Sequence, residues 1–302
     1  MQVSAARHRV SPSRFAEQLT LDAGPDRGHY RVAVDEIWNC PLVPHGGLVA
    51  ALAARAMATE LDRPDQSLRS ISVVFAEPVR PGPVEIEVGV LRRGRSISQL
   101  RATLRRAGAD AGLTALGVFG ASRPGFEFVD VSMPDAPPPD ACPSFRDQPR
   151  PTEDFLHFNF WDHVEGRAVS GHAPWEDWVP TTSEHATWYR FDDPPFLPSG
   201  ILDPLALVTL CDTMPGAVRE RMGPMEMVWL PPSSDLTVHV LAEAHSEWVL
   251  ARNRARYAGD GYASAEMELW DPDRGLVAYG TQVMFFSFPG GPPPPEQLRP
   301  RT

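Results

Sequence analysis

The segment that ends at Leu61 is apolar on almost every side when it is drawn as a helix. It reads LVPHGGLVAALAARAMATEL over residues 42–61, and the predicted helix spans residues 47–61. A helix that is hydrophobic all round must be buried on all sides. Because one flat antiparallel sheet covers only one side of a helix, this segment predicts a sheet that curls around it.

Alternating or β-branched stretches predict antiparallel strands on both sides of the chain's midpoint. In the first half, the predicted strands are residues 30–38, 70–79, 84–94, 96–108 and 111–122. In the second half, a second apolar helix is predicted at residues 201–214, with strands at 184–191, 235–243, 247–259, 262–271 and 275–288. Each half therefore has one strand, one helix and then four strands, which indicates a repeated structural unit.

A proline-rich segment separates the two halves. Residues 129–152 read VDVSMPDAPPPDACPSFRDQPRPT and contain seven prolines. Proline has no N–H to give to a ladder, so this segment is predicted to be a linker rather than a helix or a central strand. The predicted organisation is a first unit at 13–128, the linker at 129–152, a second unit at 153–288 and a Pro-rich tail at 289–302.

Charge and composition narrow the classes of partner. The net charge of −11 argues against nucleic acid and against anionic membrane surfaces. Neither a secretory h-region nor an apolar run long enough for a bilayer is present in the sequence, so we expect a cytoplasmic protein. Cysteine and histidine spacings fit no zinc site and no disulfide framework, so no metal is expected; these residues are Cys40, Cys142, Cys211, His157, His163, His172 and His185.

Two polar residues lie in otherwise apolar surroundings. Asp212 is near the end of the predicted helix LDPLALVTLCD, where burial of its carboxylate requires a partner. An exposed acid at a helix end, or a partner for an arginine, is the alternative. Gln282 shares one face of the last predicted strand with Gly280 and Met284, so an inward orientation would demand hydrogen-bond partners. An outward, solvated glutamine is the alternative.

The start of the first helix is a second candidate site. Gly46 and Gly47 let the backbone bend sharply and let another group approach closely. The first N–H groups of a helix are unpaired and carry partial positive charge, so a ligand oxygen is suited to this position. A tight turn under a crowded sheet is the alternative. His45 is either hydrogen-bonded in that turn or poised near neutral pH as a base.

Several segments together resemble the acyl-CoA thioesterases of the double-hotdog type. They are VPHGGLVAALAARAM and VVFAEPVRPGPVEIEVGVLRRGRSIS in the first half, and LVTLCDTMPGA, SSDLTVHV and GLVAYGTQVMF in the second. The resemblance covers nearly the whole chain outside the first dozen residues, the linker and the tail. It implies an α+β double hotdog, in which two curled antiparallel sheets, each wrapped around a long central helix, are joined side by side in one chain.

The resemblance also implies a reaction, the hydrolysis of acyl-CoA or a related acyl thioester by direct attack of water. The sequence has no GxSxG elbow, GxGxxG or P-loop motif that would favour another chemistry. By resemblance, Asp212 is the general base and Gln282 orients the water. Ser233 stands where members of the family have a threonine, and a shift of one residue would put Ser234 there instead.

The substrate contacts implied by the resemblance are His45, Gly46, Gly47, Arg93 and Arg95. The two arginines belong to the hairpin RRGRS, which is either a solvated turn or a contact for CoA phosphates. Two other functions remain open, a hotdog dehydratase or hydratase, which would need His45 to face Asp212, and a non-catalytic acyl-CoA-binding protein. The expected partner is an acyl-CoA or acyl-carrier thioester, with no cofactor, and a homo-oligomer through exposed sheet edges is compatible.

Overall fold

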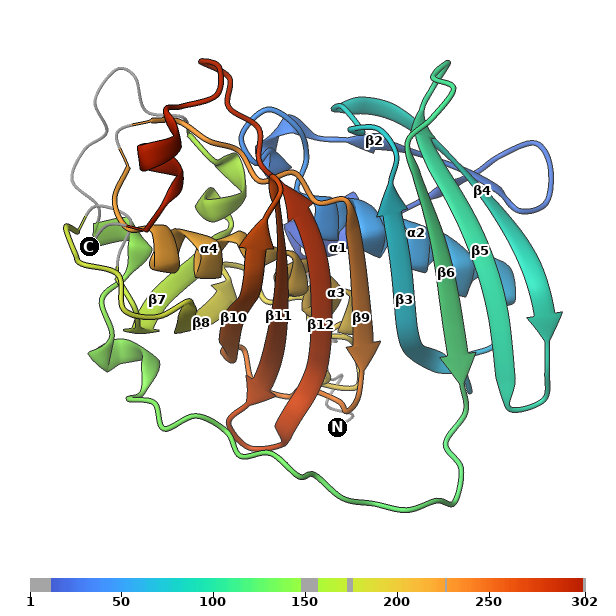
Figure 1. Ribbon diagram of the computed structural model, residues 1–302. Coiled ribbons are helices and arrows are strands. Elements are labelled where there is room, and N and C mark those ends of the chain that lie inside the picture. Colours follow the sequence, from blue (N-terminus) through green and yellow to red (C-terminus); the bar gives the residue numbers. More distant parts are fainter. Residues whose placement is uncertain (1–11, 148–156, 173–175, 226, 301–302) are drawn as a thin grey trace, which may run out of the picture.

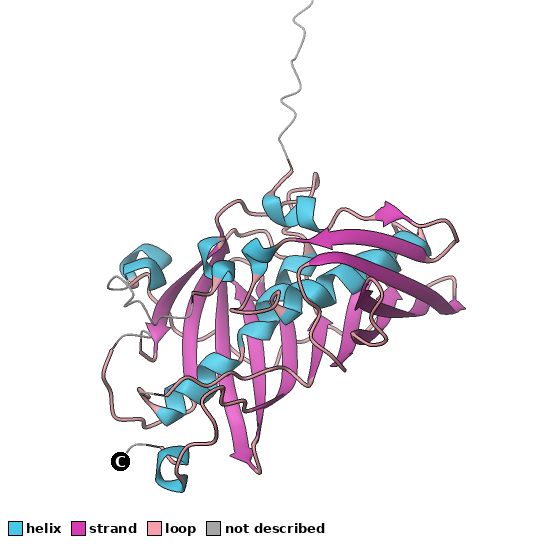
Figure 2. Ribbon diagram, turned by 90° about the horizontal axis from the view of Figure 1, so that it is seen from above, coloured by secondary structure: helices cyan, strands magenta, loops and turns pink. Residues whose placement is uncertain are grey.

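The chain folds around one large antiparallel sheet. The computed structural model describes residues 12–147, 157–172, 176–225 and 227–300. Within these residues, 12 strands form one sheet in the order β1-β2-β4-β5-β6-β3-β9-β12-β11-β10-β8-β7, and the helices lie along one face of it (Figure 1 and Figure 2). The strands are β1 (Asp22–Ala23), β2 (His29–Val34), β3 (Ser67–Phe75), β4 (Gly82–Arg93), β5 (Ile97–Arg106), β6 (Leu113–Gly120), β7 (Val164–Ser170), β8 (Glu184–Phe191), β9 (Asp235–Val240), β10 (Val249–Gly259), β11 (Tyr262–Asp271) and β12 (Gly275–Phe285).

The two halves of the chain meet in the middle of this sheet. β3 pairs with β9, and Ser72 lies opposite Thr237 at the centre of that pairing. Outward from this pair, the order is β6, β5, β4, β2 and β1 on one side and β12, β11, β10, β8 and β7 on the other. The halves are therefore related by an approximate two-fold axis, and their side-by-side pairing makes one continuous sheet.

The first predicted helix is present as α2 (Gly46–Leu61). Its apolar residues are buried on all sides, against the sheet on one side and against α3 (Pro204–Leu210) on another. The helix ends where Asp62 adopts a left-handed conformation (φ 49°). Among the described residues, no helix is long and apolar enough to cross a membrane.

The second helix differs from the prediction of one segment at 201–214. It begins at Pro204, because Asp203 accepts the N–H of Leu205 as an N-cap and proline suits the first helical position. It then breaks into α3, the short 3₁₀ turn η5 (Cys211–Thr213) and α4 (Pro215–Met222). Pro215 has no N–H for the carbonyl of Cys211, so the helix cannot continue unbroken through this point. Asp212 lies in the break, with non-helical dihedrals of φ −87° and ψ 17°.

The predicted strand at 30–38 is too long. β2 ends at Val34, and residues 36–38 form the 3₁₀ turn η1 (Glu36–Trp38). Asp35 causes the change, because its side chain accepts the N–H of Ile37 and caps the turn. The turn directs Trp38 into the core, where it is 1% exposed.

The Trp-rich region after the linker, residues 157–180, contains an edge strand that the sequence pattern did not predict. This strand is β7, and the turn η4 (Asn159–Asp162) precedes it. Part of the segment lies outside the described residues. The remaining short elements are α1 (Arg14–Gln18), η2 (Pro139–Ala141), η3 (Phe145–Asp147) and η6 (Pro295–Leu298), the last of which lies in the Pro-rich tail.

The described part of the linker packs on the face of the sheet that the helices leave open. Cys142 belongs to a small second core with Trp188, Leu250 and Trp270, and the carbonyl of Pro137 accepts the indole N–H of Trp188 at 2.9 Å. The segment after β6 runs along the edge of the molecule to reach this place (Figure 1). The boundaries of the linker, at residues 129 and 152, stay a prediction.

A buried carboxylate at the end of β11 organises the loops of the second half. Asp271 is fully buried, and one of its oxygens accepts the N–H groups of His245 and Ser246 at 2.6 and 2.8 Å. The other oxygen accepts those of Asp273 and Arg274 at 2.8 and 3.0 Å. Burial pushes the pKa of Asp271 up, but these four N–H groups outweigh burial and hold the pKa below its ordinary value.

We expect Asp271→Asn to destabilise the fold by about 2–3 kcal/mol, because an amide NH₂ would face backbone N–H groups that then lack an acceptor. A carboxyl whose pKa is lowered on folding stabilises the protein above its ordinary pKa, and that contribution is lost as the pH falls through the lowered value. Urea unfolding should therefore show a difference in unfolding free energy between the two proteins that is largest near neutral pH and smaller in acid. Asp130→Asn, in the exposed linker, is the control. A gap independent of pH would contradict this account.

The packing of α2 on α3 depends on the absence of a side chain at Gly47. A Cβ added to Gly47 would lie 2.4 Å from the carbonyl oxygen of Thr209 and 2.9 Å from the Cβ of Asp212, neither of which is the end of a flexible side chain. We expect Gly47→Ala to separate the two helices and to cost about 1–3 kcal/mol of unfolding free energy. Gly125→Ala, where a Cβ meets nothing within 4 Å, is the control. Equal melting temperatures for the two variants would mean that the close approach is not required.

Candidate active site

The break in the second helix brings Asp212 to the start of the first helix. One carboxylate oxygen, Oδ2, accepts the backbone N–H of Gly47 at 2.8 Å. The Asp212 side chain is 5% exposed, so this contact is shielded from water. A carboxylate is favourable at a helix N-terminus, where the unpaired N–H groups carry partial positive charge. The acid of one half is thus held by the backbone of the other half.

The second carboxylate oxygen of Asp212 faces two side chains from the sheet. Ser233 donates its hydroxyl to Oδ1 at 2.9 Å, and the amide of Gln282 donates to the same oxygen. The Gln282 Nε2 also lies 2.5 Å from the Ser233 hydroxyl. All three side chains predicted to be catalytic therefore meet at one point, and Gln282 points inward, 1% exposed. The alternative of a solvated glutamine on the outer face is wrong.

Ser233, and not Ser234, supplies the hydroxyl at this point. A single bridge pairs Ser233 with Met284 on β12, beside Gln282. Asp235 fixes the register by accepting the N–H of Val283 at 2.6 Å. The short strand entry before β9 is thus tied to β12 on both sides of the serine.

His45 closes the cluster on the side of the first half. Its ring stacks on Phe160 with a centroid distance of 4.1 Å, and its Nδ1 lies 3.8 Å from Asp212 Oδ2. Burial lowers the pKa of His45, and the Asp212 carboxylate offsets this only in part, so the imidazole is neutral near pH 7. Phe160 comes from the Trp-rich segment, whose role at this site the sequence pattern did not reveal.

Two buried polar atoms of the cluster have no hydrogen-bond partner among the described residues. They are the Nδ1 of His45 and the Oε1 of Gln282. Nearly all buried polar groups in folded proteins are hydrogen-bonded, to protein or to ordered water. The two atoms therefore indicate where a water molecule or a substrate oxygen would bind.

The local sequence explains why the two glycines are needed. A Cβ on Gly46 would lie 2.7 Å from Asp212 Oδ2 and 3.3 Å from the ring of Phe75. Together with the contacts of Gly47 described above, this leaves no room for a side chain at either position. The crowding agrees with the tight turn, and the oxygen bound at this helix start belongs to Asp212 of the same chain. A ligand oxygen at this position stays a prediction.

The structure does not bring Arg93 and Arg95 to the cluster. Arg93 donates to the carbonyls of Glu60 and Leu61 and so caps the opposite end of α2. At 1.5 Å per residue, that end is roughly 20 Å from the helix start. The Arg95 side chain is exposed near the same end.

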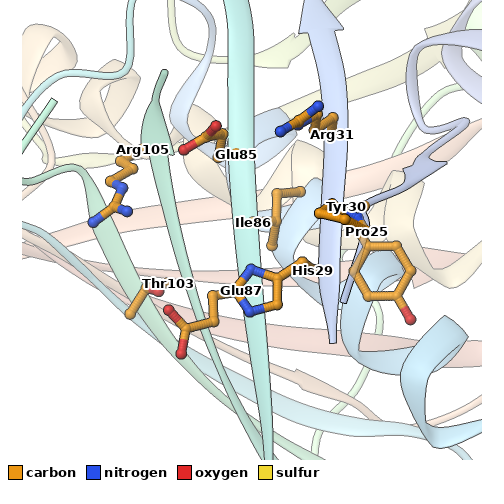
Figure 3. A pocket seen from close by; sticks show the side chains of 10 residues that line it. Pro25, His29, Tyr30, Arg31, Glu85, Ile86, Glu87, Thr103 and Arg105 are labelled. Atoms are coloured by element: carbon orange, nitrogen blue, oxygen red, sulfur yellow. The ribbon is translucent and has the colours of Figure 1, made fainter. Parts of the chain in front are cut away.

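A shallow pocket elsewhere also lacks contact with the cluster. It has a volume of about 110 Å³ and lies on the outer face of β2, β4 and β5, where His29, Glu87 and Arg105 line it (Figure 3). These residues alternate with buried ones along their strands, as solvated positions of a half-buried sheet do.

The two-fold relation of the halves gives the cluster a counterpart. Where Asp212 of the second helix meets Gly46 and Gly47, Arg55 of α2 meets Asp203 at the start of α3. The Arg55 guanidinium and the Asp203 carboxylate form an ion pair with a 2.5 Å separation. Both contacts join one helix start to the other helix, but only the first presents a carboxylate with a hydroxyl and an amide.

Comparisons with known proteins match both halves of the chain to domains of one family. Residues 34–120 match the model of an acyl-CoA thioesterase N-terminal domain, and residues 139–286 match that of an acyl-CoA thioesterase C-terminal domain. A comparison with curated proteins found no match.

Solved structures with the hotdog fold are similar over almost the whole chain. A conserved protein of unknown function from Alicyclobacillus acidocaldarius has 25% identity and a TM-score of 0.76, with 91% of this chain and 98% of that one covered. A putative thioesterase II from Thermobifida fusca has 23% identity, a TM-score of 0.76 and coverage of 92% and 99%. An acyl-CoA thioesterase II from Mycobacterium marinum has 22% identity, a TM-score of 0.70 and coverage of 92% and 100%. The two domain matches span most of the sequence, and the chain belongs to the acyl-CoA thioesterase family.

Proposed function

We propose that this chain hydrolyses acyl-CoA, or a related acyl thioester, by direct attack of a water molecule held by Asp212 and Gln282. The observation that carries the proposal is the buried carboxylate of Asp212, bound by Gly47 N–H on one oxygen and by Ser233 and Gln282 on the other. A buried carboxylate with this set of donors is fixed in orientation, as a general base must be.

The proposed reaction uses groups already at the site. Asp212 takes a proton from the water while the oxygen of the water bonds to the thioester carbonyl carbon. The Oε1 of Gln282, which lacks a partner, accepts the other hydrogen of the water. When the C–S bond breaks, the proton on Asp212 passes to the leaving thiolate, which yields free acid and thiol. Ser233 and Gln282 keep the carboxylate and the water in line for attack.

The carbonyl oxygen of the thioester would bind at the start of α2. Gly46 N–H is one of the first-turn donors that have no partner within a helix. Negative charge that develops on the carbonyl oxygen in the transition state is stabilised by fixed N–H dipoles of this kind. His45, with its unpaired Nδ1, lines the same approach.

One observation favours a second candidate, a dehydratase or hydratase acting on acyl thioesters. This reaction needs a histidine facing an acid, and His45 Nδ1 lies 3.8 Å from Asp212 Oδ2. The hydrolase reading accounts for more of the cluster, since Ser233 and Gln282 have no role in a two-residue acid–base pair. An assay for water loss from a 3-hydroxyacyl thioester separates the two, because a hydrolase releases thiol and forms no enoyl product.

We expect Asp212→Asn to lower thiol release from acyl-CoA by at least about 100-fold, since the variant has no base. Asp203→Asn is the matched control, because it removes a buried carboxylate at the two-fold-related helix contact while asparagine still caps the helix. Thiol release would be measured over acyl chains of different lengths, with melting temperatures for both variants. Full activity in Asp212→Asn, or an equal loss in Asp203→Asn, would contradict the proposed mechanism. Tight acyl-CoA binding without thiol release in the unmodified protein would instead indicate a binding protein.

A further inference from the structure

The inward face of β8 is polar although it is buried. Its inward residues include His185, Thr187 and Tyr189, and all three are at most 9% exposed. On the neighbouring strand, Asn253 lies directly opposite His185 and is completely buried. In the first half, the counterpart of β8 is β2, whose buried residues are Tyr30, Val32 and Val34. The counterpart of β10 is β4, and its buried residues are all aliphatic. This polar cluster is thus particular to the second half, where the helix breaks.

Asn253 contacts the break itself. Its Nδ2 donates to the carbonyl of Met214 at 3.0 Å and to that of Thr213 at 3.4 Å. These carbonyls follow Asp212 directly and belong to the part of the chain where Pro215 interrupts the helical bonds. Buried carbonyls that lose helical partners need another donor. The Met214 carbonyl already accepts the N–H of Ala217 at 3.1 Å, so the amide of Asn253 adds a second donor to it and a donor to the Thr213 carbonyl.

The carbonyls of the break and His185 together fix which way the Asn253 amide points. The same Nδ2 lies 3.2 Å from His185 Nε2, and His185 Nδ1 lies 3.2 Å from the Thr187 hydroxyl. Because a carbonyl can only accept, the NH₂ of Asn253 must face the break, so Nε2 must be the accepting nitrogen. His185 is then the neutral tautomer with the proton on Nδ1. Burial, with a smaller effect of Arg219, lowers its pKa to about 4, in agreement with a neutral ring.

The start of α4 packs tightly on this pair. A Cβ on Gly216 would lie 2.7 Å from His185 Nε2 and 3.2 Å from its Cε1. The His185 ring cannot move aside easily, because it is buried and hydrogen-bonded at both nitrogens. The break is therefore held by hydrogen bonds at its carbonyls and by contact at the first turn of α4.

We propose that Asn253, oriented by His185, is a positioning residue that fixes the break in the second helix and thereby aims the Asp212 carboxylate at the start of α2. We call the contacts of Asn253 and His185 with the break the clamp. The clamp does not depend on the proposed function, but its effect on catalysis does. The Oδ1 of Asn253 has no partner among the described residues. An unpaired buried oxygen is unfavourable. The hydrogen bonds that the Asn253 NH₂ donates to the break must therefore offset this cost.

Asn253→Ala tests the clamp, and Val249→Ala is its matched control. Val249 is a fully buried residue on the same face of β10. Its replacement by alanine removes core packing but no hydrogen bond to the break. We expect Asn253→Ala to lower kcat for thiol release about tenfold or more with KM within about twofold, because misplacement of the base affects the chemical step. Val249→Ala should lose comparable thermal stability with little change in kcat.

A readout without activity separates this inference from the proposed function. Hydrogen–deuterium exchange of peptides covering residues 208–218 should be about tenfold faster in Asn253→Ala than in the unmodified protein, and not in Val249→Ala. Unchanged exchange in Asn253→Ala would overturn the clamp. Faster exchange with unchanged kcat would overturn the positioning role. Faster exchange in a protein that releases no thiol from any acyl-CoA would support the clamp and overturn the proposed function.

Gly216→Ala tests the same arrangement without the loss of a polar group. Alanine is favoured over glycine within a helix, so this change should stabilise an α4 that is free of the sheet. With His185 at 2.7 Å, we expect the opposite, a lower melting temperature and a kcat reduced about as much as in Asn253→Ala. A stabilised variant with full activity would contradict the packing of His185 against the break.

Discussion

The candidate site depends on one contact between the halves, the hydrogen bond from Gly47 N–H to the carboxylate of Asp212. It satisfies a backbone donor that has no partner within α2 and a buried charge that has no partner within its own helix. The Gly47 N–H and the Oδ2 of Asp212 each have their hydrogen-bond partner in the other half, while Oδ1 is bound by Ser233 and Gln282 of its own half. The glycines at positions 46 and 47 follow from this contact, because any side chain there would collide with the aspartate or with Thr209.

The approximate two-fold axis makes the two helix contacts equivalent in place but not in chemistry. At one, a carboxylate meets a bare helix start; at the other, Arg55 meets a helix start already capped by Asp203. The capped start has an acceptor for its first N–H groups and an ion pair that covers it. A water molecule or a carbonyl oxygen would have to displace these groups. The fold is therefore duplicated, while the arrangement suited to hydrolysis is built once.

The positions of several strands and of the first helix could be predicted, because they depend on periodicity and on local composition. The two strands 184–191 and 262–271 have the predicted bounds, and α2 begins within one residue of its prediction. The meeting of Asp212, Ser233 and Gln282 followed from the family resemblance, since residues 21 to 70 apart cannot be brought together by periodicity alone. The inward polar row of β8 was visible as alternation in EHATWYRF, but a burial pattern of this kind gives no partner for Asn253.

The misplaced end of β2 and the misplaced start of the second helix share one physical cause. In both, a polar side chain takes a backbone N–H that the predicted element would have used. Asp35 ends β2 early, and Asp203 delays the second helix, because a short acid can bond the backbone N–H two residues ahead. The break at Asp212 has a different cause, because Pro215 has no N–H to continue the helix and the Asp212 carboxylate binds Gly47 of the other half. A continuous helix would bury the carboxylate against its own turn, whereas the interruption before Pro215 exposes carbonyls that the sheet must satisfy. A helix that presents a carboxylate in this way needs a polar group beneath its break, and Asn253 is that group in the half that carries Asp212.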